Sequence, residues 1–203
     1  ADLAKFVKKL AEKLTPHETA LAVCQKVYES ITYKHGVTGV HSLATEAWNT
    51  KIGVCQDFAH VTLGALRAVG IPARYVSGYL LTHPPAGQPR LVGSDASHAW
   101  VSVYFPDLPE GARWCDFDPT NNRWGWHAPG VDYVTVATGR DFGDVSPLRG
   151  VIHGGSRHTL TVGVTVEEIG MEAQVTAVPD HNDAPARMEA APVATQSQSQ
   201  SQS

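Results

Sequence analysis

The sequence contains few cysteines. Only Cys24, Cys55 and Cys115 occur among 203 residues. An odd and sparse set argues against a disulfide framework and is typical of a reducing compartment, so we expect a cytoplasmic protein. The sequence also lacks a Cys-x-x-Cys or His-x-x-x-His pair, and its ten histidines are scattered. We therefore expect no metal site and no cofactor.

Long basic and long apolar runs are missing as well. The formal net charge is −4, and without a basic cluster we expect no binding to nucleic acid through phosphates. No apolar run approaches the roughly 20 residues that cross a bilayer, so we expect no association with a membrane. The lysine-rich start is typical of an amphipathic helix and not of a signal peptide. The length allows one domain with a real core plus extra segments.

The two ends of the chain carry little further information about the fold. Residues 178–203 are rich in Ala, Pro, Asp and Asn and end in Gln-Ser repeats. That composition cannot bury a core, so we expect a disordered tail over 170–203. The chain begins at Ala1 instead of Met, which suggests processing or excision from a longer protein.

Helical patterns fill the first third of the sequence. Apolar spacing predicts an N-terminal helix within residues 1–14. Thr15 and Glu18 form a capping-box pattern around Pro16, which predicts a second helix from Pro16 to about Ile31. A short helix is expected over 42–48. The next helix should begin near Val54 and end at Gly70, where glycine acts as the C-cap and Pro72 follows.

Strand patterns follow these helices. Alternating or β-branched segments predict strands over 73–81, 98–105, 113–118, 133–137 and 158–166. Residues 82–93 carry three prolines and two glycines and should form a loop, directly before His98. Helices followed by strands indicate an α+β fold with an antiparallel sheet, and the main domain should extend over 15–169.

Cys55 is the first candidate for chemistry. The commonest alternative is a buried, inert thiol. However, Cys55 falls in the first turn of the predicted helix, where unpaired N–H groups and the helix dipole favour a thiolate. Cys24 lies mid-helix on an apolar face and suits a structural role. Cys115 lies in a predicted strand, and no helix end helps it to ionise.

His98 and two aspartates are the candidate partners of that thiol. His98 shares a strand face with Trp100, opposite Val101, although a surface histidine would also fit this position. Asp116 and Asp118 share a face of the next strand, and spacing alone does not choose between them. A thiolate nucleophile needs a base within reach and a group that orients the base. Other histidines are rival bases: His83, His127, His153 and His158.

Several segments resemble the bacterial transglutaminase-like family. They are Gly53-Val54-Cys55-Gln56-Asp57-Phe58-Ala59-His60, the stretch from Leu66 to Leu80, His98-Ala99-Trp100-Val101, Phe117-Asp118-Pro119-Thr120-Asn121 and the stretch from Gly139 to Pro147. The similarity extends over residues 15–167. It implies a papain-like fold in which a nucleophile helix packs on an antiparallel β-sheet. It also implies a catalytic triad of Cys55, His98 and Asp118, and so favours Asp118 over Asp116.

The resemblance also implies a reaction. Cysteine enzymes of this family transfer or hydrolyse the acyl group of a glutamine amide or peptide bond through a thioester. The partner would be a protein or peptide substrate, and the sequence leaves open whether an amine or water accepts the acyl group. Relatives often carry a β-rich domain before this one, so we expect an excised catalytic domain. A non-catalytic binding or scaffold domain is the alternative, and the intact triad argues against it.

An oxyanion needs two hydrogen-bond donors. The Cys55 backbone N–H should supply one of them. Tyr33, Trp48 and Gln56 are candidates for the second, and Trp100 is a further candidate for contact with substrate. Tyrosine and tryptophan more often lie in a core or at its rim, and the sequence does not rank the four.

Overall fold

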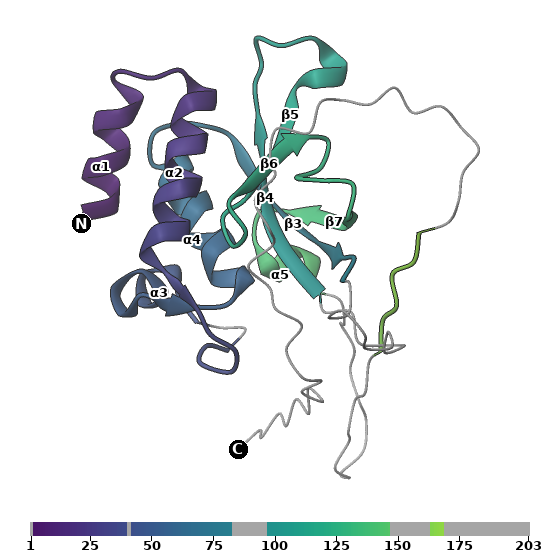
Figure 1. Ribbon diagram of the computed structural model, residues 1–203. Coiled ribbons are helices and arrows are strands. Elements are labelled where there is room, and N and C mark those ends of the chain that lie inside the picture. The colour runs from purple at the N-terminus through teal and green to yellow at the C-terminus, as the bar shows by residue number, and fades with distance from the viewer. Residues whose placement is uncertain (1, 40–41, 83–96, 147–162, 169–203) are drawn as a thin grey trace.

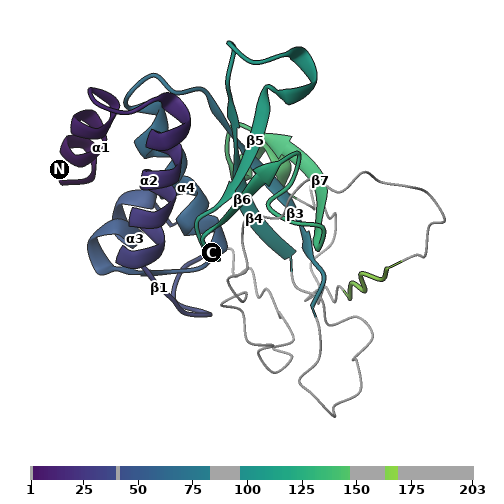
Figure 2. The ribbon, with the colours of Figure 1, turned by 45° about the horizontal axis from the view of Figure 1, so that its top comes forward.

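A computed structural model describes residues 2–39, 42–82, 97–146 and 163–168. Four helices form one layer of the molecule, on one side of a sheet (Figures 1 and 2). They are α1 (Asp2–Ala11), α2 (Pro16–Ser30), α3 (Ala44–Thr50) and α4 (Cys55–Arg67). The capping box predicted before α2 is present, because the Glu18 N–H donates to Thr15 Oγ1 and the Thr15 N–H donates to Glu18 Oε2.

The second layer is a five-stranded antiparallel sheet in the order β6-β5-β4-β3-β7. Its strands are β3 (Ala73–Leu80), β4 (Ser97–Tyr104), β5 (Trp114–Asp118), β6 (Arg123–Trp126) and β7 (Tyr133–Gly139). Two short strands, β1 (Thr32–Tyr33) and β2 (Ile52–Gly53), pair in parallel beside the helices. A 3₁₀ turn, η1 (Glu110–Ala112), precedes β5, and α5 (Phe142–Val145) follows β7. The expected α+β class with an antiparallel sheet is therefore confirmed.

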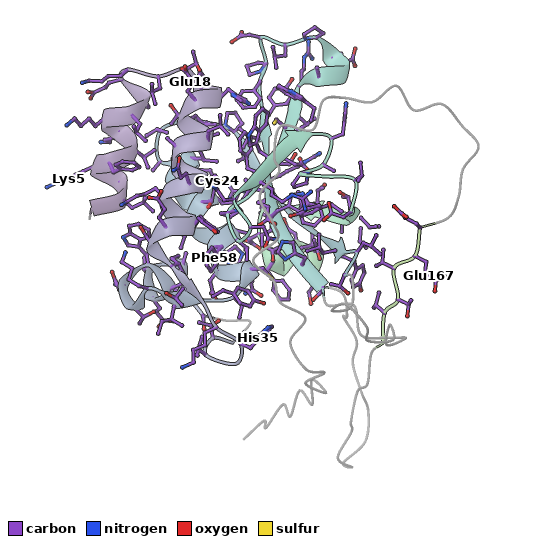
Figure 3. The ribbon with its side chains drawn as sticks, in the orientation of Figure 1. Lys5, Glu18, Cys24, His35, Phe58 and Glu167 are labelled. Carbon is purple, nitrogen blue, oxygen red and sulfur yellow. The ribbon has the colours of Figure 1, made fainter. Side chains whose placement is uncertain are left out.

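Each face of the sheet buries its own set of side chains. Toward the helices, Phe58 of α4 packs with Val101 of β4 and Phe117 of β5, all with 0 % exposure. Figure 3 shows Phe58 and Cys24 between the helices and the sheet, whereas Lys5 lies on the outer side of α1 and Glu18 at the upper end of α2. The opposite face carries a smaller cluster of Val76, Leu80, Trp100 and Tyr133. Alternation along β4 thus sends Trp100 and Val101 to opposite faces, as the sequence predicts.

Gly78 is required by this second face. A Cβ atom at this position would lie 2.5 Å from the Trp100 ring and 2.1 Å from the backbone oxygen of Val134. The close approach is possible only because glycine has no side chain. The same part of β3 carries a β-bulge against β7, between Ser77 and Gly78. The Trp100 indole therefore lies directly against the β3 backbone.

Some expected elements differ from the structure. Neither β6 nor α5 was expected, since each has only four residues and gives a weak periodic signal. Residues 163–168 form no strand beyond a single bridge at Val164. The rest of the strand expected over 158–166, most of the loop expected over 82–93 and the tail lie outside the described residues. Among the described helices, none has the length and apolar character needed to cross a membrane.

Candidate active site

Cys55 is the first residue of α4, and local contacts fix it there. The Asp57 carboxylate accepts hydrogen bonds from the Val54 N–H at 2.8 Å and from Thr38 Oγ1 at 2.6 Å. Gly53 must lack a side chain, because a Cβ atom would lie 2.8 Å from that of Asp57. These contacts hold the turn that enters the helix. The sequence did not assign Asp57 this role, although its position three residues after Val54 is the usual signal of such a cap.

The surroundings of Cys55 differ from those of the other two thiols. Cys55 is half-buried, whereas Cys24 and Cys115 are buried. Burial raises the pKa of the Cys24 thiol well above its ordinary value and that of Cys115 to about 12. Cys55 instead lies at a helix N-terminus, where the dipole favours a negative charge. Position and accessibility therefore make Cys55 the best placed of the three to react as a thiolate.

His98 lies near the start of β4 and is 1 % exposed. Its Nε2 atom donates to Asp118 Oδ2 at 2.7 Å. Its Nδ1 atom is buried and makes no hydrogen bond of ordinary geometry within the described residues. The Cys55 thiol lies close enough for its charge to act on the ring. Since Asp118 occupies Nε2, Nδ1 is the nitrogen left for the thiol.

The charge state of His98 follows from its partners. Burial alone would lower the pKa of His98, but the Asp118 carboxylate and the Cys55 thiol outweigh burial and raise the pKa to about 10. The imidazole is therefore protonated at neutral pH. A protonated imidazole beside a thiol favours a thiolate–imidazolium pair, which is the reactive form of a cysteine nucleophile.

Asp118 accepts an unusually complete set of hydrogen bonds. Its Oδ2 atom accepts from His98 Nε2, from Asn121 Nδ2 at 2.7 Å and from the Tyr133 hydroxyl at 2.6 Å. Its Oδ1 atom accepts from the backbone N–H groups of Thr120 and Asn121. Burial acts to raise the pKa of Asp118, but His98, Tyr133 and Asn121 together hold it below its ordinary value. Asp118 is thus a fixed negative charge beside the imidazole.

Tyr133 and Asn121 are members of this site that the sequence analysis missed. Asn121 follows the Asp-Pro-Thr segment directly, so its position was a usable signal. Tyr133 lies on β7, three strands away from β5, and no local pattern links it to Asp118. Arg123 stabilises this arrangement, because its guanidinium lies over the Tyr133 ring and pairs with Asp132 at 2.6 Å.

Asp116 shares the face of β5 with Asp118 but has different partners. Its Oδ2 atom accepts a hydrogen bond from Trp100 Nε1 at 2.8 Å. Burial raises the pKa of Asp116, and nearby polar groups only partly oppose the effect. The two aspartates that the sequence could not separate therefore serve different neighbours: Asp118 contacts His98, and Asp116 contacts Trp100.

The structure separates the four further candidate residues. Tyr33 on β1 is half-buried, and burial together with the nearby Cys55 and Asp118 charges raises its pKa. Trp48 lies on α3 with the Lys51 ammonium 3.3 Å from its ring centroid. Gln56 is the second residue of α4 and is half-buried. The Trp100 ring packs beside His98 and is fully buried, so a substrate cannot contact it.

The rival histidines do not meet the thiol in the described part of the chain. His127 lies on an exposed turn with a positive φ of 74°, on the far face of the sheet. His83, His153 and His158 lie outside the described residues. No group of three or more metal-ligating side chains occurs among residues that the structure describes.

The chain is similar in sequence to known bacterial proteins. The chain is 41% identical over 152 residues to an uncharacterized protein of Mycobacterium tuberculosis and covers 46% of that protein, so it spans about half the length of such relatives. A shorter segment of 90 residues, 44% of this chain, is 38% identical to a protein-glutamine gamma-glutamyltransferase of Pseudomonas aeruginosa and covers 13% of it.

Two solved structures share the fold. A candidate cysteine protease from Cytophaga hutchinsonii superposes with a TM-score of 0.56 at 29% identity, over 71% of this chain and 44% of that one. Legionella pneumophila LapG superposes with a TM-score of 0.50 at 18% identity, over 73% of this chain and 76% of that one. A family model described as transglutaminase-like matches residues 4–119, more than half of the chain. This chain therefore belongs to the transglutaminase-like superfamily.

Proposed function

We propose that this protein is a cysteine acyltransferase or hydrolase that acts on the amide group of a glutamine side chain or a peptide bond. The observation that supports this proposal is the arrangement of His98. One ring nitrogen is bonded to Asp118, the other is buried without a hydrogen-bond partner among the described residues, and the Cys55 thiol at the start of α4 lies close enough for its charge to act on the ring. A nucleophile, a base and an orienting carboxylate in this order are the elements of covalent catalysis on a carbonyl group.

In the first half-reaction the Cys55 thiolate attacks the carbonyl carbon, and a C–S bond forms. The carbonyl electron pair moves to oxygen and gives a tetrahedral oxyanion. As the oxyanion collapses, the C–N bond breaks, and the His98 imidazolium donates its Nδ1 proton to the leaving ammonia or amine. The product is a thioester on Cys55 and a neutral imidazole that Asp118 keeps oriented through Nε2.

In the second half-reaction an amine or water attacks the thioester carbon. Neutral His98 accepts the proton of the attacking group, the C–S bond breaks, and the Cys55 thiolate is restored. An amine acceptor gives a new amide, and water gives an acid. The Pseudomonas relative is a glutamyltransferase by name, and the Cytophaga neighbour is a candidate cysteine protease, so we propose a protein or peptide substrate for either outcome.

The oxyanion requires donors that point to it. The Cys55 N–H belongs to the first turn of α4, where backbone donors have no partner within the helix, so it is the first of these donors. We assign the second to the Tyr33 hydroxyl, because β1 pairs with β2 directly before α4 and places Tyr33 opposite Gly53, whereas the Trp48 ring lies under the Lys51 ammonium. Tyr33→Phe should lower kcat on an amide substrate by roughly 100-fold with a smaller change in KM, and Trp48→Phe should lower it less.

The test of the function is a paired assay on glutamine-containing peptides. The purified protein is incubated with a peptide library in the presence and absence of a primary amine, and the products are identified by mass. We expect ammonia release without the amine, or amide exchange with it, and loss of both in Cys55→Ala. Equal turnover by the wild type and Cys55→Ala would contradict the mechanism. Absence of both reactions across the library, with Cys55 inert to thiol reagents, would favour a binding domain.

A further inference from the structure

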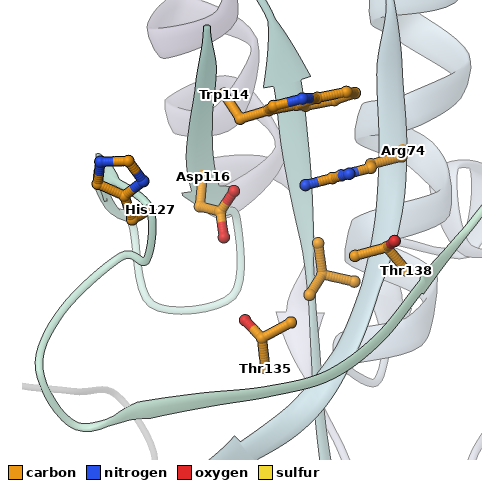
Figure 4. Close-up of a pocket in the computed structure, with 7 residues that line it drawn as sticks. Arg74, Trp114, Asp116, His127, Thr135 and Thr138 are labelled. Atoms are coloured by element: carbon orange, nitrogen blue, oxygen red, sulfur yellow. The ribbon is translucent and has the colours of Figure 1, made fainter. Parts of the chain in front are cut away.

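A pocket opens on the sheet face that the helices do not cover. It has a volume of about 260 Å³ and lies over β3, β5 and β7. Its walls are Arg74, Val76, Trp114, Asp116, His127, Thr135 and Thr138 (Figure 4). None of these residues belongs to the proposed triad, and the fully buried Trp100 ring stands between this pocket and His98.

Two opposite charges face this pocket without pairing with each other. Arg74 extends from β3 under the Trp114 ring, with its Cζ atom 3.7 Å from the ring centroid. Within the residues that the structure describes, Arg74 forms no ion pair, and its Nε atom is buried without an acceptor. Asp116 points inward from the opposite wall and is 4 % exposed (Figure 4). Its Oδ2 atom accepts a hydrogen bond from Trp100 Nε1.

An unpaired buried donor costs free energy until a ligand or water satisfies it. The Arg74 guanidinium fits a carboxylate, and the Asp116 carboxylate fits an ammonium group. Between them, Val76 and the Trp114 ring offer apolar contact, and Thr135 and Thr138 offer hydroxyl groups. His127 at the rim is the other titratable group that faces the pocket.

We propose that this pocket binds a free α-amino acid with an apolar side chain. The carboxylate of the ligand would pair with Arg74, the ammonium group with Asp116, and the side chain would contact Trp114. A ligand with only one charge would pair with one of these two side chains and be repelled by the other. This binding does not depend on the proposed catalytic function, since it uses no residue of the triad.

The test measures binding of three related probes to the whole protein by isothermal titration calorimetry. L-leucine carries both charges, N-acetyl-L-leucine only the carboxylate, and L-leucinamide only the ammonium group. We expect L-leucine to bind and each of the other two to bind at least tenfold more weakly. Arg74→Gln and Asp116→Asn should each weaken the binding of L-leucine at least tenfold, whereas the exposed-loop control Asp107→Asn should leave it unchanged.

A second measurement uses the wild type alone and so does not depend on the folding of a variant. In a ¹⁵N-labelled sample, L-leucine should shift the indole N–H signal of Trp114 and leave that of Trp48, on α3, in place. Failure of L-leucine to bind at 50 mM would overturn the proposal. Equal affinity for the three probes, or a shift at Trp48 and none at Trp114, would also overturn it.

Discussion

Asp116 and Asp118 lie two residues apart on β5 and point to the same face, yet their surroundings shift the pKa values of the two carboxylates in opposite directions. Asp118 accepts five hydrogen bonds, two of them from backbone N–H groups in the turn that follows it. Its pKa is held down. Asp116 accepts a bond from Trp100 and faces a pocket, and burial raises its pKa. The same residue type on the same strand is therefore a fixed anion at one position and a poorly solvated carboxylate at the other.

The difference arises from position relative to the end of the strand. Asp118 is the last residue of β5, so the chain turns back immediately and presents its N–H groups to the carboxylate. Asp116 lies inside the strand, where both neighbours are committed to ladder hydrogen bonds with β4 and β6. A carboxylate that must stay ionised beside a histidine is better stabilised where backbone donors are free.

The sharpest way to test this comparison is to neutralise each aspartate. Asp118→Asn should lower kcat on an amide substrate by roughly 100- to 10,000-fold, because the imidazole loses both its orientation and the charge that stabilises its protonated form. Asp116→Asn should lower kcat less than tenfold. Steady-state kinetics would measure both, with circular dichroism to check folding. An inactive Asp116→Asn beside a nearly normal Asp118→Asn would reverse the assignment.

A larger residue at Gly78 should disturb the packing of Trp100. Gly78→Ala places a methyl group against the Trp100 ring, so we expect a loss of roughly 1–3 kcal/mol in the free energy of unfolding. Urea denaturation would measure it. The exposed helical position Gly64, where a Cβ atom meets nothing within 4 Å, is the matched control, and Gly64→Ala should be neutral or stabilising. Equal destabilisation by both changes would contradict the role of Trp100.

Removal of one donor from Asp118 should give a smaller effect on catalysis. Tyr133→Phe deletes the hydroxyl that lies 2.6 Å from Oδ2 but keeps the ring under Arg123. We expect a roughly tenfold fall in kcat, because hydrogen bonds to charged groups contribute about 1.5–3 kcal/mol and four donors remain. The pH dependence of kcat should shift as well, which a purely structural role of Tyr133 would not cause. An unchanged profile and kcat would show that Tyr133 does not position Asp118.

The pH dependence of stability should also separate the two aspartates. The pKa of His98 is raised to about 10 in the folded protein, from about 6.5 in the unfolded chain. The stabilisation from His98 is therefore fully present below about pH 6.5 and is lost as the pH rises toward 10. The difference in unfolding free energy between the wild type and Asp118→Asn should shrink over that window. The difference in unfolding free energy between the wild type and Asp116→Asn should not shrink over the same pH window.

Much of this arrangement was predictable, and the missing parts have a common reason. The Thr15 capping box, the start of α4 at Cys55 and the two faces of β4 follow from local spacing, and all are present. Contacts across the sheet do not follow from spacing. Tyr133 reaches Asp118 only because β7 is placed beyond β3, and Arg74 and Asp116 line one pocket only because β3 and β5 flank β4. Strand order, which one sequence does not give, decides both.

The most direct test of the proposed triad is the rate at which each cysteine reacts with iodoacetamide at pH 7, resolved by peptide mass in the folded protein. Cys55 should be alkylated at least tenfold faster than the buried Cys24 and Cys115. Its rate should fall in Asp118→Asn and His98→Ala and stay close to the wild-type value in Asp116→Asn. Equal labelling of the three cysteines, or a Cys55 rate that is indifferent to His98 and Asp118, would contradict the account.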